Sequence, residues 1–155
     1  MPDDAIDAAY RRYFPLVRAK CRRMLGDPEE AQDVAQEAFM RLWEAGLAAN
    51  DPRTATAWIF RTCTRLAIDR LRRRRFEPSP PCDEAGPDLE GAVHARRELE
   101  RIARDVPRSE LAIVCLSRLD GLTHAEIAEV EGVSDRTVRR LLARFNERLA
   151  RLGEA

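Results

Sequence analysis

Residues 119–149 read LDGLTHAEIAEVEGVSDRTVRRLLARFNERL, and this stretch decides how the C-terminal part of the chain folds. Thr123 and Glu126 have the spacing of a capping box, in which each side chain bonds the backbone N–H of the other residue, so a short helix should begin here. Gly132 permits the left-handed backbone of a tight turn, and Ser134 is a typical cap for a second helix. The sequence therefore predicts a helix-turn-helix.

The second helix of this motif carries most of its charge as arginine. Residues 136–155 hold six arginines against two acidic residues. Val133, Val138 and Leu141 are expected to complete the core between the two helices, which leaves the charged residues outside. Arginine on such a helix can reach guanine edges or phosphates in the major groove of DNA, although a merely solvated face would look the same by charge alone. The residues expected to point outward are Asp135, Arg136, Arg139, Arg140 and Arg144.

A helical bundle is predicted upstream. Apolar residues recur at intervals of three and four, which predicts helices over residues 4–25, 28–45 and 54–75. The segment Gly26-Asp27-Pro28 separates the first two, since its aspartate can cap a helix and its proline suits the first helical position. Pro15 should kink or restart the first helix. Three amphipathic helices of this kind can close one core.

The stretch between the bundle and the helix-turn-helix has a different composition. Residues 77–91 are rich in proline and acidic side chains, which predicts a flexible acidic linker. Helices are again predicted over 92–104 and from Pro107. Because runs of β-branched residues are absent, the sequence offers little for strands. The predicted fold is all-α, with two small helical domains at residues 1–76 and 92–155 joined by the linker.

The chain is neutral overall, with 27 basic and 27 acidic residues among 155. Taken as a sum, this neutrality argues against a nucleic-acid-binding protein, which usually carries excess basic charge. The charges are segregated, however, because residues 53–75 hold eight arginines against a single acid. Two arginine clusters on predicted helices, this one and the one near the C-terminus, are typical of surfaces that face phosphate.

The sequence predicts no metal site, no cofactor and no catalytic group. Cys21, Cys63, Cys82 and Cys115 are far apart and form none of the close pairs typical of zinc ligands. Three of them fall at apolar helix positions, whereas Cys82 lies in the linker and should be exposed and reactive. No apolar stretch approaches the roughly 18 residues that span a bilayer. We therefore expect a cytoplasmic protein that is neither an enzyme nor inserted in a membrane.

Three blocks, in this order, resemble the extracytoplasmic-function (ECF) sigma factors of bacterial RNA polymerase. GDPEEAQDVAQEAFMRLW at residues 26–43 resembles regions 2.1–2.2, TAWIFRTCTRLAIDRLRRRR at 56–75 resembles regions 2.3–2.4, and the block at 119–149 resembles region 4.2. The resemblance implies a subunit that binds core RNA polymerase, directs it to promoters and initiates transcription. The alternatives are a stand-alone helix-turn-helix regulator of duplex DNA and a helical adaptor that binds only protein. The block at 26–43 distinguishes the sigma factor from the regulator, which needs no helix for docking on polymerase.

The resemblance also implies roles for particular residues. In the family, region 2.2 docks on the clamp helices of the polymerase β′ subunit, and here this implies Asp33, Gln36 and Glu37. The remaining partners that it implies are the β flap, promoter DNA and an anti-sigma factor. The residues implied in −10 recognition and melting are Asp51, Arg53, Trp58, Arg61, Arg65, Arg72 and Arg73. The residues implied in −35 recognition are Ser134, Arg136, Thr137, Arg139, Arg140 and Arg144.

A few positions depart from the family's pattern. Glu131 stands before the turn glycine, where an apolar residue is usual, and Arg65 stands where asparagine is common. Leu141 occupies a position that is frequently basic. Trp58 matches a tryptophan typical of the family, but it lies on the apolar stripe of its helix, which favours a place in the core.

Overall fold

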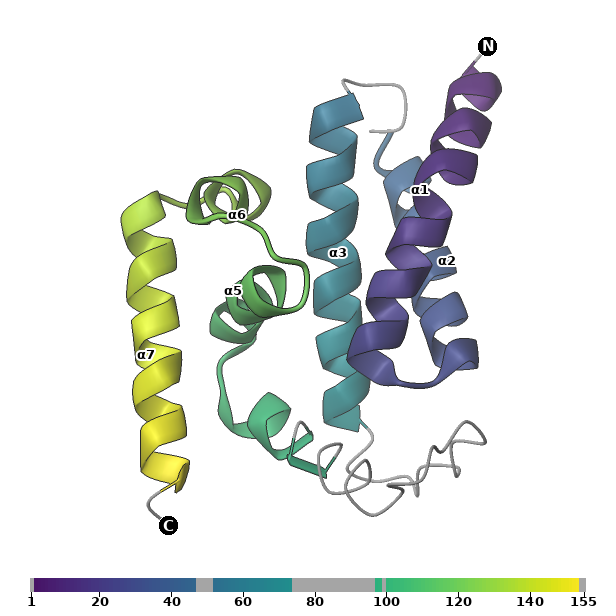
Figure 1. Cartoon of the computed structure of the whole chain (residues 1–155). Coiled ribbons are helices and arrows are strands. Elements are labelled where there is room, and N and C mark those ends of the chain that lie inside the picture. Colours follow the sequence, from purple (N-terminus) through teal and green to yellow (C-terminus); the bar gives the residue numbers. More distant parts are fainter. Residues whose placement is uncertain (1, 47–51, 74–96, 99, 154–155) are drawn as a thin grey trace.

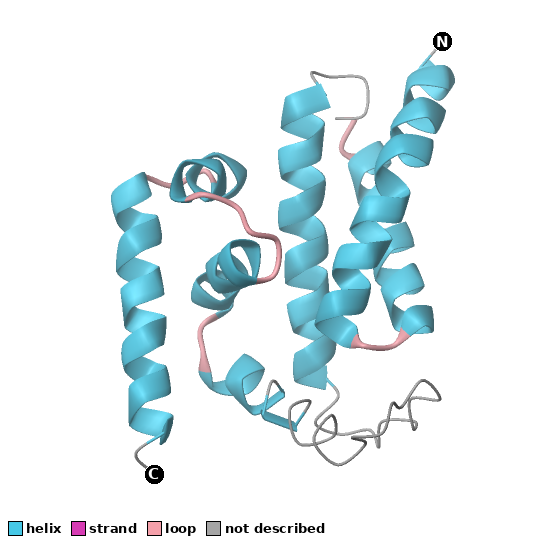
Figure 2. Ribbon diagram, viewed as in Figure 1, coloured by secondary structure: helices cyan, strands magenta, loops and turns pink. Residues whose placement is uncertain are grey.

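The fold is all-α in the part of the chain that the computed structural model describes (Figure 1, Figure 2), as the sequence predicts. The description leaves out residues 1, 47–51, 74–96, 99 and 154–155. The predicted linker at 77–91 and Cys82 lie outside the described residues. Residues 97–98 and 100–105 are helical. The other helices are α1 (Pro2–Leu25), α2 (Pro28–Glu44), α3 (Pro52–Arg73), α5 (Arg108–Arg118), α6 (His124–Glu131) and α7 (Asp135–Gly153).

Helices α1, α2 and α3 form the predicted bundle, lying side by side in Figure 1. The turn between α1 and α2 has the predicted chemistry: Gly26 adopts a left-handed φ of 74°, and Asp27 caps α2 by accepting a hydrogen bond of 2.9 Å from the Glu29 N–H. Pro15 does not restart the first helix, because α1 runs without interruption from Pro2 to Leu25.

The helix-turn-helix is formed by α6 and α7. Thr123 and Glu126 complete the capping box, with bonds of 2.7 Å from the Thr123 N–H to the Glu126 carboxylate and 3.2 Å from the Glu126 N–H to the Thr123 hydroxyl. Gly132 takes the left-handed conformation, at φ 67° and ψ 34°. Val133 was expected in the core but is 37% exposed, because it follows directly on the turn. The core under the turn joins Ile127 of α6 and Val138 of α7 to Ile113 and Leu116 of α5.

The N-terminal bundle and the C-terminal helices share one hydrophobic core. Helix α3 packs on α1 and α2 and also on α5 and α6 (Figure 1). The buried residues of the bundle therefore continue without a break into those of the C-terminal part. The C-terminal members of this core are Ala103, Val106, Leu111, Ala112, Val114, Cys115 and Phe145.

Polar contacts tie the same two parts together. Lys20, which is the chain's single lysine and is fully buried in α1, donates to the carboxylate of Asp120 in the turn before α6. Arg23 donates to the other oxygen of Asp120 at 3.2 Å. On α3, Asp69 accepts a hydrogen bond of 2.7 Å from Arg108 at the start of α5. Each of these pairs joins an N-terminal helix to the C-terminal region, so charge complementarity reinforces the shared core.

Replacing Asp120 should destabilise the fold strongly, because Asp120→Ala leaves the Lys20 ammonium buried without its partner carboxylate. Breaking a buried pair by removing one partner costs about 3–5 kcal/mol of unfolding free energy. Urea denaturation followed by circular dichroism measures this loss. Asp7→Ala is the matched control, since it removes the same group from the exposed Asp7–Arg11 pair of α1 and should cost less than about 1 kcal/mol. Equal losses in the two variants would contradict this account of Lys20.

Candidate nucleic-acid interface

The outer face of α7 presents a row of exposed arginines. Val138 and Phe145 are buried on the inner face of the helix. Ser134 caps α7 by accepting a bond of 3.1 Å from the Thr137 N–H, and the two hydroxyls lie 2.9 Å apart. Arg139 forms an exposed ion pair of 2.8 Å with Asp135, one turn earlier. The arginines that the structure places on the exposed surface, as the sequence predicts, are Arg136, Arg139, Arg140 and Arg144.

The arginines of α3 have a different environment. Arg65 donates to the Glu131 carboxylate at 2.8 Å, and the Arg61 Nε lies 3.8 Å from the same oxygen. Glu131 ends α6, and its side chain is only 3% exposed. Burial raises the pKa of Glu131, although the positive charges of the two arginines act in the opposite direction. Burial likewise lowers the pKa of Arg65, although the negative charge of Glu131 opposes this shift. The structure thus joins two residues implied in −10 recognition to the helix-turn-helix.

Among the other residues implied in −10 recognition, the described side chains of Trp58, Arg72 and Arg73 do not converge on one site. Arg72 bonds the backbone carbonyls of Ala103 at 2.7 Å and Val106 at 2.8 Å, while Arg73 is exposed. Trp58 is half-buried and packs against the core. Asp51 lies outside the described residues. Arg53 lies in α3, but only its backbone is described.

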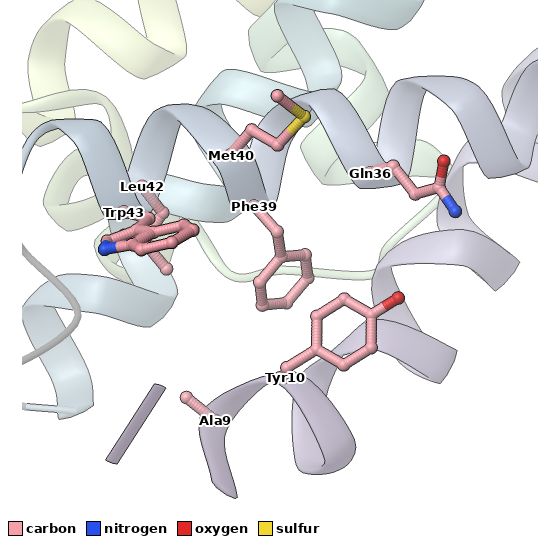
Figure 3. A pocket seen from close by; sticks show the side chains of 7 residues that line it. All are labelled: Ala9, Tyr10, Gln36, Phe39, Met40, Leu42 and Trp43. Carbon is pink, nitrogen blue, oxygen red and sulfur yellow. The ribbon is translucent and has the colours of Figure 1, made fainter. Parts of the chain in front are cut away.

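Helix α2 carries the residues implied in polymerase docking. Asp33 and Gln36 are exposed, and Glu37 pairs with Arg41 at 2.8 Å. Gln36 also lines a hollow of about 300 Å³ between α1 and α2 (Figure 3). The rings of Tyr10 and Phe39 pack edge to face in this hollow, with their centroids 5.2 Å apart. The other side chains lining this hollow are Ala9, Met40, Leu42 and Trp43.

Met40 and Trp43 are functional candidates that sequence reasoning missed. They are 59% and 62% exposed, which is unusual for large apolar side chains on a helix whose apolar stripe is already buried. The signal in the sequence was their position, because neither belongs to the stripe of α2 formed by Val34, Phe39 and Leu42. An exposed apolar surface beside acidic and amide groups is typical of a protein-binding site.

The three described cysteines lie in the interior of the molecule. In the described part of the chain, no three histidine, cysteine or acidic side chains come together to hold an ion. Cys21, Cys63 and Cys115 are buried and free. Burial raises the pKa of Cys63 well above its ordinary value and that of Cys115 to about 11, whereas a hydrogen bond with Cys63 lowers the pKa of Cys21. None of the described helices has the length and apolar character needed to cross a membrane.

The fold and these surfaces together define a helical DNA-binding protein with a helix-turn-helix and a second surface suited to a protein partner. The comparison with protein families supplies the particular group. A family model for Sigma-70 region 2 matches residues 9–77, and one for Sigma-70, region 4 matches residues 96–145. The two matches cover about three quarters of the chain.

Curated relatives agree with these matches. The chain is 27% identical over 150 residues to the ECF RNA polymerase sigma factor SigM of Mycobacterium tuberculosis, an alignment that covers 96% of this chain and 76% of SigM. It is 26% identical over 163 residues to the ECF RNA polymerase sigma factor SigW of Bacillus subtilis, covering 94% of this chain and 85% of SigW. The chain belongs to the ECF group of the sigma-70 family, the subunits that direct RNA polymerase to promoters. The match to region 2 disfavours a stand-alone regulator.

Proposed function

We propose that this chain binds core RNA polymerase through residues 1–76 and reads promoter DNA through both of its helical regions, with residues 92–155 reading the −35 element. The observation that carries this proposal is the presence, in one chain, of an exposed arginine row on α7 and an acidic and apolar face on α2. A regulator that binds duplex DNA alone needs the first surface but has no use for the second. The chain would act in the cytoplasm as a non-catalytic subunit of polymerase.

Polymerase docking is assigned to the exposed face of α2. Asp33 and Gln36 supply polar groups, and the adjacent Met40 and Trp43 supply apolar area beside the hollow (Figure 3). Large apolar and aromatic side chains at the centre of an interface carry most of the binding energy, while polar groups around them set orientation. The clamp helices of the β′ subunit are the proposed partner of this face. The β flap and an anti-sigma factor are further proposed partners.

The exposed face of α7 is assigned to the −35 element as duplex DNA. Helix-turn-helix proteins place this helix in the major groove, where its first turns contact base edges. Arg136, Arg139 and Arg140 lie in those turns, and Arg144 lies one turn later, where it can bond phosphate. Ser134 and Thr137 bond one another at the start of the helix and would face the DNA backbone.

The −10 element is assigned to α3 and the residues that precede it. Arg61 and Arg65 lie on the side of α3 that faces α6, and Arg73 is exposed near its end. Arginine supports both phosphate contact and stacking on unpaired bases, which suits a melted strand. Asp51, Arg53, Trp58 and Arg72 complete the proposed set. Each of the two DNA contacts would be weak alone, and the polymerase would make them cooperative by holding them together.

Run-off transcription tests the proposed function as a whole. Purified core polymerase supplemented with the chain should initiate at specific positions on templates drawn from the source genome, and core polymerase alone should not. The reason is that the chain supplies the promoter contacts that core lacks. Absence of specific initiation, together with absence of binding to the β′ clamp helices, would refute the proposal.

Substitutions on α2 test the docking surface. Asp33→Ala with Gln36→Ala should weaken binding to core polymerase about tenfold, which corresponds to about 1.4 kcal/mol. Met40→Ala with Trp43→Ala should weaken binding more, because an aromatic side chain that becomes buried in an interface contributes about 2 kcal/mol or more of binding free energy that truncation removes. Fluorescence anisotropy with labelled chain measures both affinities, and thermal melting checks that the fold is kept. Asp105→Ala, an exposed acid outside α2, is the control, and affinity equal to that of the control would place docking elsewhere.

Single arginine substitutions on α7 test the −35 assignment. Arg139→Ala and Arg140→Ala should each weaken binding of the holoenzyme to promoter DNA by about 1–3 kcal/mol and relax base preference at the −35 element. Arg151→Ala removes the same charge from the exposed far end of α7 and should have a much smaller effect. Filter binding to promoter variants measures affinity and preference together. A uniform loss for all three variants would indicate general electrostatics rather than groove recognition.

A further inference from the structure

Arg148 differs from the arginines in the first turns of α7, because it pairs with a buried acid on another helix. Its Nε lies 3.0 Å from a carboxylate oxygen of Glu110, which belongs to the first turn of α5. The Glu110 side chain is only 2% exposed. A buried carboxylate is costly unless a cation or a hydrogen-bond donor compensates it. Arg148 therefore serves the contact between two helices, although by composition it belongs to the arginine cluster of α7.

A second polar contact joins α7 to the other end of α5. Arg118, in the last turn of α5, donates a hydrogen bond to the side-chain carbonyl of Asn146. Its guanidinium also lies 5.1 Å from the centre of the Phe145 ring, a distance at which a cation is attracted to an aromatic face. Phe145 is itself buried in the core. Helix α5 thus holds the second half of α7 at two points, one near each end of α5 (Figure 1).

The two contacts lie on opposite flanks of the buried stripe of α7. Successive residues of a helix are rotated by about 100°, so Asn146 lies about 100° to one side of Phe145 and Arg148 about 60° to the other. Phe145 faces the core between them. Apolar burial alone is non-directional and permits a helix to roll by a small angle about its axis. Because both flanks are held, the rotation of α7 about its own axis is fixed.

This rotation decides where the outward arginines of α7 point. A helix with its side chains is about 10–12 Å across, so a roll of about 30° moves the tip of a side chain by about 3 Å. A hydrogen bond to a base edge is lost over such a displacement, because its donor and acceptor must lie about 2.7–3.2 Å apart. Attraction to phosphate persists, since Coulomb energy falls slowly with distance. A roll of α7 should therefore impair base recognition more than overall affinity for DNA.

We propose that Glu110 and Arg118 are positioning residues for −35 recognition: by holding Arg148 and Asn146, they set the rotation of α7 at which the arginines of its first turns meet base edges. Both residues belong to α5 and act only through their partners on α7. The base preference of the helix-turn-helix thus depends on a helix outside that motif. This inference rests on the proposed function of α7, and it adds the residues that orient the reading helix.

Glu110→Gln tests the first contact, because it removes the charge and keeps the shape of the side chain. One base pair typically confers about 5- to 150-fold preference, and holoenzyme with this variant should lose about threefold or more of its preference for a promoter over a single-base −35 variant. Its affinity for duplex DNA without a promoter should change less than about twofold. Filter binding measures both quantities on promoters found by run-off transcription. Glu147→Gln, which removes the same charge from the exposed surface of α7, is the control and should keep the preference.

Arg118→Lys tests the second contact. It keeps the positive charge but removes the planar guanidinium that stacks on Phe145 and bonds Asn146, so it should lower the −35 preference in the same way. Double variants test whether the residues act through their partners. Glu110→Gln with Arg148→Gln should lose no more preference than the worse of the two single variants, because residues that act as a pair are not additive. Thermal melting followed by circular dichroism sets a temperature at which every variant is folded.

Three results would overturn the proposal. The first is an unchanged −35 preference in either Glu110→Gln or Arg118→Lys. The second is an additive loss in the double variant, and the third is an equal loss of preference and of affinity for DNA without a promoter, which a general weakening of the fold would produce. A wild-type holoenzyme without any −35 preference would instead refute the assignment of α7 to the −35 element, so the two failures are distinguishable.

Discussion

Helix α3 is buried on two sides although it carries many arginines, and burying a charged side chain is costly without a partner. The rest of the structure depends on how these arginines are paired. One side packs on α1 and α2 and the other on α5 and α6. Cys63, Thr64, Ala67 and Ile68 are all fully buried, and the Thr64 hydroxyl is satisfied by donating to the Phe60 carbonyl at 2.7 Å. The arginines that emerge between these layers need partners within the protein. Arg72 finds backbone carbonyls, and Arg65 finds Glu131.

The neutral total charge acquires a structural meaning from these contacts. Lys20 and Arg65 from the N-terminal bundle are paired with Asp120 and Glu131 from the C-terminal region. On α7, by contrast, Arg136, Arg139, Arg140 and Arg144 lie on the exposed surface, and Arg139 pairs with Asp135 of its own helix. Farther along the same helix, Arg148 pairs with the buried Glu110 of α5 at 3.0 Å. Two clusters that look equivalent by composition therefore differ: Arg65 and Arg72 of α3 are engaged within the molecule, whereas the arginines in the first turns of α7 face solvent. Neutrality here comes from acids placed opposite bases, and it is compatible with a DNA-binding protein.

The features predicted well from the sequence are those with local causes. The capping box at Thr123, the left-handed Gly132 and the cap at Asp27 each depend on neighbours within a few positions. The exposure of individual apolar side chains was harder to predict. Val133 is exposed although its place in the motif suggests burial, and the exposed surface of Met40 and Trp43 on α2 was not recognised. Periodicity shows which residues can face a core, but it does not show where that core ends.

The sequence by itself determined the helices, the helix-turn-helix, the outward arginines of α7 and the resemblance to ECF sigma factors, because these depend on propensity, spacing and motif order. Only the tertiary structure decided that Lys20 is buried, that Asp120 holds it, and that Glu131 meets Arg65. The partners of these pairs lie 100 and 66 positions apart. Their meeting depends on how α3 packs against α5 and α6. No local pattern encodes that packing, because an amphipathic helix can bury its apolar face against any apolar surface of complementary shape.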